Sequence, residues 1–316
     1  MTSSQLHIQV EDYLRLRRSL GFKLVSAGVL LASLVRHAEQ VGHQGPLTTQ
    51  LAVAWAQQTA SEDPATAAQR LAVVRVFACH QAALDSVTEI PAKGILGDVS
   101  RRRSQPHIYS DDEIGMLLDQ CRQLTPRGGL RPAAYVTLFG LLACTGLRLS
   151  EACRLDRADV DLDSGVLTVS LTKFRKSRLV PLDPTAVVAL EGYLAVRDAR
   201  VGVGASGRLL RTERTDHLKP DTVLKTFCRI RQRLGWSAQG RAHRPRIHDL
   251  RHTFTVRRLL AWHVEGVDVD AKMLALSTYL GHVKPSETYW YLSAIPELMA
   301  VTSHRFEHFA SQQVRP

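Results

Sequence analysis

The segment DVDLDSGVLTVSLTKFRKSRLVPL, residues 159–182 of a chain of 316 residues, decides the fold class. Its apolar residues follow the two-residue period of strands that bury one face. Three short strands are predicted, at 159–162, 166–171 and 178–182. Asp163-Ser164-Gly165 is typical of a turn between the first two strands, and residues 172–177 form the second turn. The segment therefore predicts one small antiparallel sheet.

The rest of the chain is predicted to be helical, because its apolar residues recur with the helical period on both sides of this segment. In the first 90 residues, helices are predicted at 8–20, 27–41, 49–59 and 64–84. Nearer the strands, Ser110 to Glu113 fits a capping box that opens a helix to about Cys121. Arg131 to Thr145 predicts another helix, which Gly146 ends. After the strands, helices are predicted at 184–199, 221–234, 248–264, 270–280 and 296–309.

These elements predict a mainly α fold with a small antiparallel β-sheet, of the α+β class, in two domains. Residues 1–90 can form a small helical bundle, and residues 107–316 form the larger domain that holds the sheet. Residues 91–106 contain prolines, glycines and the run Arg101-Arg102-Arg103, which is typical of an exposed linker. Such a basic linker fits either contact with a phosphate backbone or simple solvation of the charges.

The charge of the chain favours a polyanionic partner. Lys and Arg number 41 against 30 Asp and Glu, which gives a formal net charge of +11. Residues 1–95 carry 8 Lys/Arg and 7 Asp/Glu, so nearly all of the excess lies in the remainder. Residues 229–258 hold nine arginines and one acid, with a break at 235–245. A membrane-surface helix would place its cations along one continuous face, so nucleic acid is the better match.

Composition argues against several other classes of protein. No apolar run approaches the ~20 residues that cross a bilayer. The N-terminus lacks the basic start and apolar core of a secretion signal. The five cysteines are scattered and never form a C-x-x-C pair, so we expect buried, reduced thiols in a cytoplasmic protein and no zinc site.

Four short stretches carry residues that could do chemistry. They are TGLRLSE at 145–151, LTKFRKSRLVPL at 171–182, HDLRH at 248–252, and LGH at 280–282 with Tyr291 nine residues later. Within the third stretch, His248 and Arg251 are three apart, so on a helix they point at one ligand. Taken singly, each stretch more often has a structural explanation. In order, these explanations are a surface salt bridge, a solvated hairpin turn, a chance spacing of His and Arg, and a residue at a helix end.

Together and in this order, the four stretches resemble the tyrosine recombinase (phage integrase) family. The resemblance covers nearly the whole chain. It implies a helical DNA-clamping domain of the core-binding, SAM-like kind at 1–90, a linker at 91–106, and a catalytic domain at 107–316 that ends in the helix at 296–309. In the family this last helix often docks on a neighbouring subunit. Packing on its own domain is an equally open alternative.

The resemblance also implies the main catalytic residues. Arg148 and Arg251 match the two family arginines, whose planar forks fit the non-bridging oxygens of a scissile phosphate. Tyr291 matches the nucleophile, which forms a 3′-phosphotyrosyl link and frees a 5′-hydroxyl. This link retains the energy of the broken phosphodiester bond, so a second DNA end reverses the step without ATP. Because cations surround the phosphate, no metal or other cofactor is implied.

Three further positions follow from the same motifs, with departures. Lys173 matches the general acid of the hairpin, although glycines that relatives carry there are absent and Lys176 remains a second choice. His248 matches the histidine that assists proton transfer or binds the phosphate, and His282 matches another phosphate contact. Tyr289 is a rival nucleophile, but lies about 200° around a helix from Tyr291, so only one of them can face the site.

The predicted function is site-specific DNA recombination for a mobile element, through a Holliday junction. The implied partners are double-stranded DNA with inverted-repeat sites, further copies of the chain in a tetramer, and in some systems a partner recombinase or accessory protein, with no membrane. Two other functions stay open at this point: relaxation of supercoils, as in type IB topoisomerases, and DNA binding without catalysis. Glu151 and Asp249 are predicted to orient the arginines.

Overall fold

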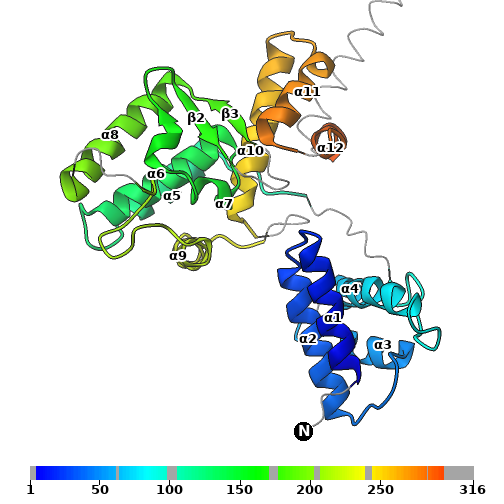
Figure 1. Ribbon diagram of the computed structural model, residues 1–316. Coiled ribbons are helices and arrows are strands. Elements are labelled where there is room, and N and C mark those ends of the chain that lie inside the picture. Colours follow the sequence, from blue (N-terminus) through cyan, green and yellow to red (C-terminus); the bar gives the residue numbers. More distant parts are fainter. Residues whose placement is uncertain are drawn as a thin grey trace, which may run out of the picture. The chain divides into compact units, whose positions relative to one another are not determined.

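The computed structural model describes residues 5–61, 64–97, 105–170, 177–202, 207–238, 244–282 and 284–294. The chain divides into two compact units, Met1–Arg103 and Ser104–Pro316. Figure 1 labels their helices and strands. The helix predicted at 296–309 lies outside the described residues. No described helix has the length and apolar character needed to span a membrane.

All regular secondary structure in the described residues of the first unit is helical (Figure 1). Its helices are α1 (Gln5–Ser19), α2 (Val25–Gln40), α3 (Thr49–Gln57) and α4 (Pro64–Ala82). Each predicted helix is present, with ends that differ by a few residues. Their apolar stripes meet in one core, in which Leu31, Leu34, Trp55 and Phe77 are almost fully enclosed.

The second unit combines helices with a small sheet, as predicted. Before the sheet lie α5 (Asp111–Arg122), α6 (Leu130–Thr145), the single turn α7 (Leu149–Ala152) and the 3-10 turn Arg157–Asp159. The predicted capping box is confirmed, because Ser110 accepts from the Glu113 backbone and the Glu113 side chain accepts from the Ser110 backbone. After the sheet lie α8 (Pro184–Val201), α9 (Pro220–Arg233), α10 (Ile247–Val264), α11 (Val269–Leu280) and α12 (Ser286–Ala294).

The sheet has three antiparallel strands in the order β1 (Val160–Asp161), β2 (Val166–Val169), β3 (Arg178–Pro181). All three are shorter than predicted. Gly165 turns the chain between β1 and β2 at φ 62°, and its carbonyl accepts from the Leu182 backbone 2.8 Å away. Residues 171–176, the predicted second turn, lie outside the described residues. The register places Val169 opposite Arg178 at the end of the sheet that leads into this segment.

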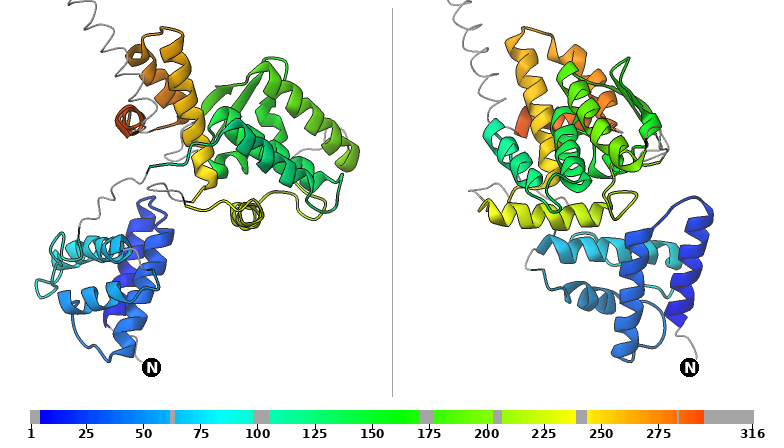
Figure 2. Two further views of the ribbon diagram at one scale, coloured as in Figure 1. Left: turned by 180° about the vertical axis from the view of Figure 1, so that it is seen from behind. Right: turned by 90° about the vertical axis from the view of Figure 1, so that its left-hand side faces the viewer.

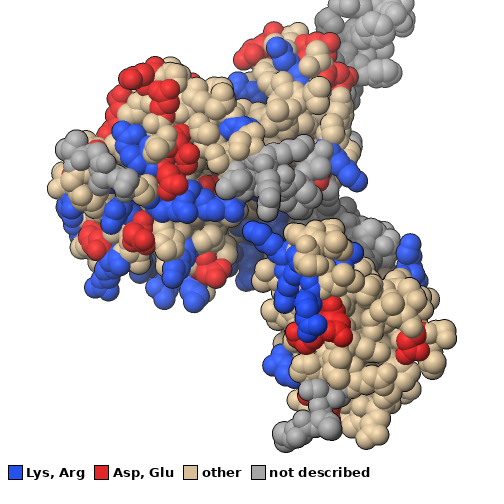
Figure 3. Space-filling view, in the orientation of Figure 1, with Lys and Arg blue, Asp and Glu red and all other residues tan. Residues whose placement is uncertain are grey.

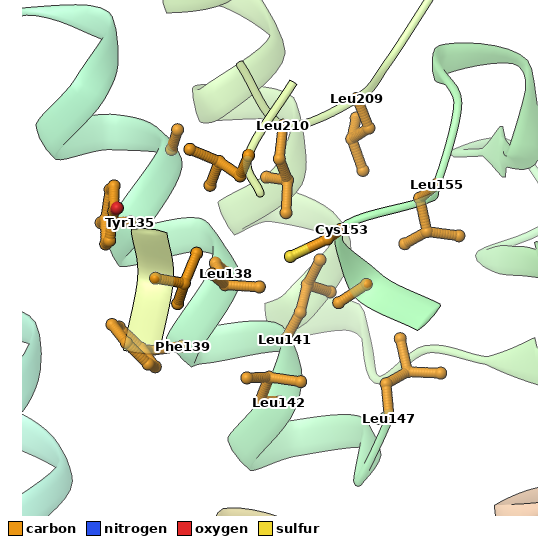
Figure 4. Close-up of a cluster of buried hydrophobic side chains, with 14 of the residues drawn as sticks. Tyr135, Leu138, Phe139, Leu141, Leu142, Leu147, Cys153, Leu155, Leu209 and Leu210 are labelled. Carbon is orange, nitrogen blue, oxygen red and sulfur yellow. The ribbon is translucent and has the colours of Figure 1, made fainter. Parts of the chain in front are cut away.

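The main core of the second unit forms around α6, whose residues are apolar on nearly every side. Figure 4 shows Leu138, Leu141 and Leu142 of this helix in one cluster with Cys153 and Leu210. The prediction that all cysteines are buried is wrong for Cys79 and Cys144, which are exposed, and Cys228 is half-buried. All five cysteines are free thiols.

Helix α10 contributes residues to both cores of the second unit. It packs against α6 on one side and α11 on the other. Figures 1 and 2 show α11 and α12 on one side of α10 and α6 on the opposite side, and β3 also contacts α11. A second core, which includes Leu259, Met273 and Leu280, joins α10 to α11 and α12. Side chains from all these elements can therefore meet along α10.

Candidate active site

Arg148 stands in the short connection between α6 and α7. Helix α6 ends at Gly146, which has φ 63° and leaves 2.7 Å between a hypothetical Cβ and the Phe254 ring, so only glycine fits this turn. The Arg148 guanidinium then donates through Nη1 to Glu151 Oε1 at 2.8 Å and through Nη2 to the Gly281 carbonyl at 2.9 Å. These two hydrogen bonds fix the direction of the side chain.

Arg251 lies on the inner face of α10 and is only 2% exposed. It donates through Nη1 to the Gly146 carbonyl and through Nη2 to the Leu280 carbonyl, both at 2.7 Å. Burial, followed by the charge of Arg148, lowers the pKa of the Arg251 guanidinium to about 10, and the charge of Tyr291 acts in the opposite direction. The guanidinium therefore stays charged at neutral pH and lies within electrostatic reach of both side chains.

The two arginines are anchored on neighbouring carbonyls at the C-terminal end of α11. That end carries the negative pole of the helix dipole, which stabilises nearby cations. Gly281 makes the approach possible, because it has φ 68° and a Cβ there would lie 2.9 Å from Arg178 Nη1 and 3.5 Å from Arg148 Nη1. Segments more than 100 residues apart thus place two forked cations side by side.

A third arginine, Arg178 at the start of β3, completes this group. Its Nη2 donates to Glu151 Oε2 at 2.8 Å, and its Nε donates to the Tyr279 carbonyl at 2.7 Å. Glu151 is 4% exposed and lies between Arg148 and Arg178. Burial acts to raise the pKa of Glu151, but hydrogen bonds and charge from Arg178, and then from Arg148, lower it to about 2.

His248 lies one turn before Arg251 on α10. Its ring reaches solvent, yet desolvation by surrounding side chains, followed by the charges of Arg251, Arg246 and Arg148, lowers the pKa of the imidazole. The ring is therefore neutral at pH 7. The predicted orienting residue Asp249 is buried and accepts from the Arg246 backbone and guanidinium at the first turn of α10.

His282 follows Gly281 and connects α11 to α12. Its backbone N–H donates to the Ser277 carbonyl at 2.9 Å, and its Nδ1 lies 2.7 Å from Thr288 Oγ1. Thr288 is fully buried and also hydrogen-bonds Ser277 Oγ at 2.6 Å. This network fixes the His282 ring through Nδ1 and ties the first turn of α12 to α11.

The two tyrosines of α12 point in different directions. Tyr291 is 2% exposed, and its hydroxyl lies 2.6 Å from Nδ1 of His252 on α10. Tyr289 is 42% exposed. The contact with His252 places the Tyr291 hydroxyl next to the α10 residue that follows Arg251, and the charge of Tyr291 acts on the pKa of Arg251.

The structure thus brings five of the six predicted site residues together, namely Arg148, His248, Arg251, His282 and Tyr291. Lys173 and its alternative Lys176 lie outside the described residues. In the described part of the chain, no three His, Cys, Asp or Glu side chains are grouped so as to hold a metal ion.

Sequence reasoning did not single out two residues that the structure places in the site. His252 follows His248 by four positions, and this spacing puts both on one helix face. Their rings meet edge-on with centroids 4.8 Å apart. Arg178 gave no comparable signal, because it is one of several cations in a basic run and its partner Glu151 is 27 residues away.

Comparisons with known proteins bear on the family and the fold of the chain. The model of the phage integrase family matches residues 109–297. The chain is 39% identical to the y4rB protein of Sinorhizobium fredii over 94% of this chain and 96% of that protein. It is 32% identical to tyrosine recombinase XerC of Rhodospirillum centenum over 64% of this chain and 54% of that one. A lambda integrase tetramer bound to a Holliday junction has a similar fold, with a TM-score of 0.61 and 20% identity, covering 89% of this chain and 78% of that one.

Proposed function

The chain belongs to the phage integrase family of tyrosine recombinases, and from this premise we propose that it cuts and rejoins DNA strands at specific sites through a 3′-phosphotyrosyl intermediate. The observation that carries the proposal is the placement of the Arg148 and Arg251 guanidiniums on adjacent carbonyls, with the Tyr291 hydroxyl held 2.6 Å from Nδ1 of the residue that follows Arg251 on α10. Two forked cations beside one phenol suit a phosphodiester as substrate.

In the proposed reaction, Tyr291 Oη attacks the phosphorus of one strand. The new O–P bond forms as the bond from phosphorus to the 5′ oxygen breaks, and that oxygen takes a proton to leave as a hydroxyl. Arg148 and Arg251 stabilise the charge that builds on the non-bridging oxygens. The acid in this proposal is Lys173, with Lys176 as the alternative, and His248 and His282 contact the phosphate.

Glu151 and Arg178 act on this reaction through Arg148. Oε1 of the carboxylate accepts from the guanidiniums of both Arg148 and Arg178, and Oε2 accepts from Arg178 and from the Arg148 backbone, so the carboxylate holds the Arg148 fork at a fixed angle. Arg178 in turn ties Glu151 to the Tyr279 carbonyl near the end of α11. Positioning of this kind lowers the cost of orienting the cations when the phosphate arrives.

We propose that DNA binds along α9. Three cations of this helix, Lys225, Arg229 and Arg233, follow each other at intervals of four and are exposed. Figure 3 shows Lys and Arg side chains gathered along the lower edge of the second unit, around α9. In this proposal the unit Met1–Arg103 also contacts the duplex, and the linker at 91–106 follows the phosphate backbone of the DNA.

Replacing these three cations by glutamine is expected to weaken DNA binding to a similar extent for every sequence. Each phosphate contact makes the slope of log affinity against log salt steeper by about 0.9. The slope of the triple variant should therefore be less steep than that of the wild type by about 3. Binding to duplex DNA is measured between about 50 and 200 mM salt. Lys272→Gln, which removes one exposed charge on α11, is the control. An unchanged slope in the triple variant would remove α9 from the interface.

The full proposal includes strand exchange between two duplexes. We propose that four copies of the chain assemble on inverted-repeat sites and exchange strands through a Holliday junction, for a mobile element. The lambda integrase complex named above supports this assembly by its fold. A partner recombinase or accessory protein would enter at the same step.

The test begins with the DNA that flanks the gene. A footprint of the purified protein on this DNA defines the site, and duplexes nicked at successive positions within it serve as suicide substrates. The proposal expects a protein–DNA adduct that withstands denaturation and disappears after proteinase treatment. Protection of the site without any adduct on the full set of nicked duplexes would contradict cleavage and point to a DNA-binding protein without catalysis.

A further inference from the structure

The proposed cleavage also requires a group that accepts the proton of the nucleophile. A phenol has an ordinary pKa near ~10, so Tyr291 must lose its proton as it attacks. Arginines favour the resulting anion, but they have no lone pair to accept a proton. His282 directs its Nδ1 to Thr288 instead. The proton needs an acceptor within hydrogen-bond distance of Tyr291 Oη.

His252 provides such an acceptor. Its Nδ1 lies 2.6 Å from Tyr291 Oη, within the distance expected of a general base and its substrate. The two rings have centroids 5.5 Å apart, and the centroid of the Trp290 ring lies 6.2 Å from that of the imidazole and 5.2 Å from that of Tyr291. Because α10 also holds Arg251, one helix places the base beside the residue that binds the phosphate.

We propose that His252 is a catalytic base that takes the proton of Tyr291 during strand cleavage and returns it during rejoining. This inference rests on the proposed function and deepens it. Tyr291 donates to Nδ1 in the neutral tautomer that carries its hydrogen on Nε2. As the bond from Oη to phosphorus forms, the proton moves to Nδ1 and the imidazole becomes imidazolium. When the 5′-hydroxyl attacks in reverse, the same proton returns to the leaving phenolate.

The His252 imidazole lies among rings of α10 and α12. The His248 ring, which is neutral at pH 7, packs edge-on against it at 4.8 Å, and Tyr291 and Trp290 face it from α12. An imidazole accepts a proton at Nδ1 only in its neutral form. Cleavage should therefore slow as the pH falls and His252 becomes protonated.

The test compares His252→Asn with the wild-type chain in single-turnover cleavage of the nicked substrate. Asparagine keeps a hydrogen-bond acceptor near the position of Nδ1 but cannot take a proton in this pH range. We expect a rate about 10²- to 10⁴-fold lower at neutral pH and loss of the acid limb of the pH profile. His263→Asn makes the same chemical change further along α10 and should cleave at the wild-type rate. In His252→Ala, added imidazole should restore part of the rate.

A second measurement does not depend on cleavage. With tyrosine labelled at Cζ, the ¹³C signal that is missing in Tyr291→Phe should move as the wild-type imidazole titrates, and should stay fixed in His252→Asn. Wild-type rate and pH profile in His252→Asn would overturn the base assignment. A second outcome would also overturn the base assignment. If His252→Asn is slow but keeps the acid limb of the pH profile, and imidazole does not rescue His252→Ala, His252 has a packing role only. Absence of any wild-type adduct would instead refute the proposed function itself.

Discussion

Tyr291→Phe is expected to abolish the covalent protein–DNA adduct, with a loss on the order of 10⁴-fold or more. The substitution removes the single atom that bonds to phosphorus, while the ring, which is 2% exposed, still fills its place between α10 and α12. The measurement is adduct formation on the nicked substrate, resolved on a denaturing gel. Binding to the same DNA should survive, because the cations of α9 are unchanged.

Tyr289→Phe is the matched control for this result. It makes the same chemical change two residues away on the same helix, at a side chain that is 42% exposed. We expect it to form the adduct at the wild-type rate. If instead Tyr289→Phe lost the adduct and Tyr291→Phe kept it, the nucleophile would be Tyr289, and α12 would have to turn by about 160° on DNA.

Glu151→Gln is expected to destabilise the second unit by about 3 to 5 kcal/mol, because it removes the one carboxylate between two arginines in a buried site. Glutamine keeps the shape but holds Arg148 and Arg178 without a countercharge. Calorimetry of the full chain measures the effect. Asp119→Asn, which breaks the exposed pair of Asp119 with Arg122, should cost less than about 1 kcal/mol.

The same substitution has a defined dependence on pH. The pKa of Glu151 is about 2 in the folded chain and near its ordinary value of 4.5 in the unfolded chain. The ionised carboxylate therefore contributes about 3 kcal/mol to the free energy of unfolding. This contribution is fully present above about pH 4.5 and is lost as the pH falls toward 2. The stability difference between wild type and Glu151→Gln should shrink between pH 6 and pH 3. A difference that stays constant over this range would show that the carboxylate is not held by the two arginines.

Much of the fold could be predicted from the sequence because local chemistry determines it. The capping box at Ser110 and the glycine that ends α6 are local signals, and both are confirmed. The fold class followed from the switch between helical and two-residue periods. The single turn α7 was missed, because four residues are too few to show a helical period.

The geometry of the site could not be predicted from local sequence in the same way. Motif order suggested which residues belong together, yet it could not say how they are held. Arg251 reaches the Gly146 carbonyl over 105 residues of sequence, and His252 reaches Tyr291 over 39. These contacts depend on how α6, α11 and α12 pack around α10, and hydrophobic periodicity does not specify that packing.

The central claim is that the Tyr291 phenol and the guanidiniums of Arg148 and Arg251 act on one phosphodiester. The most direct measurement is mass spectrometry of the adduct after digestion by protease and nuclease. The account predicts a nucleotide joined through its 3′ phosphate to the peptide that contains Tyr291, at the oxygen of that residue. A nucleotide on any other residue, or a link through a 5′ phosphate, would contradict it.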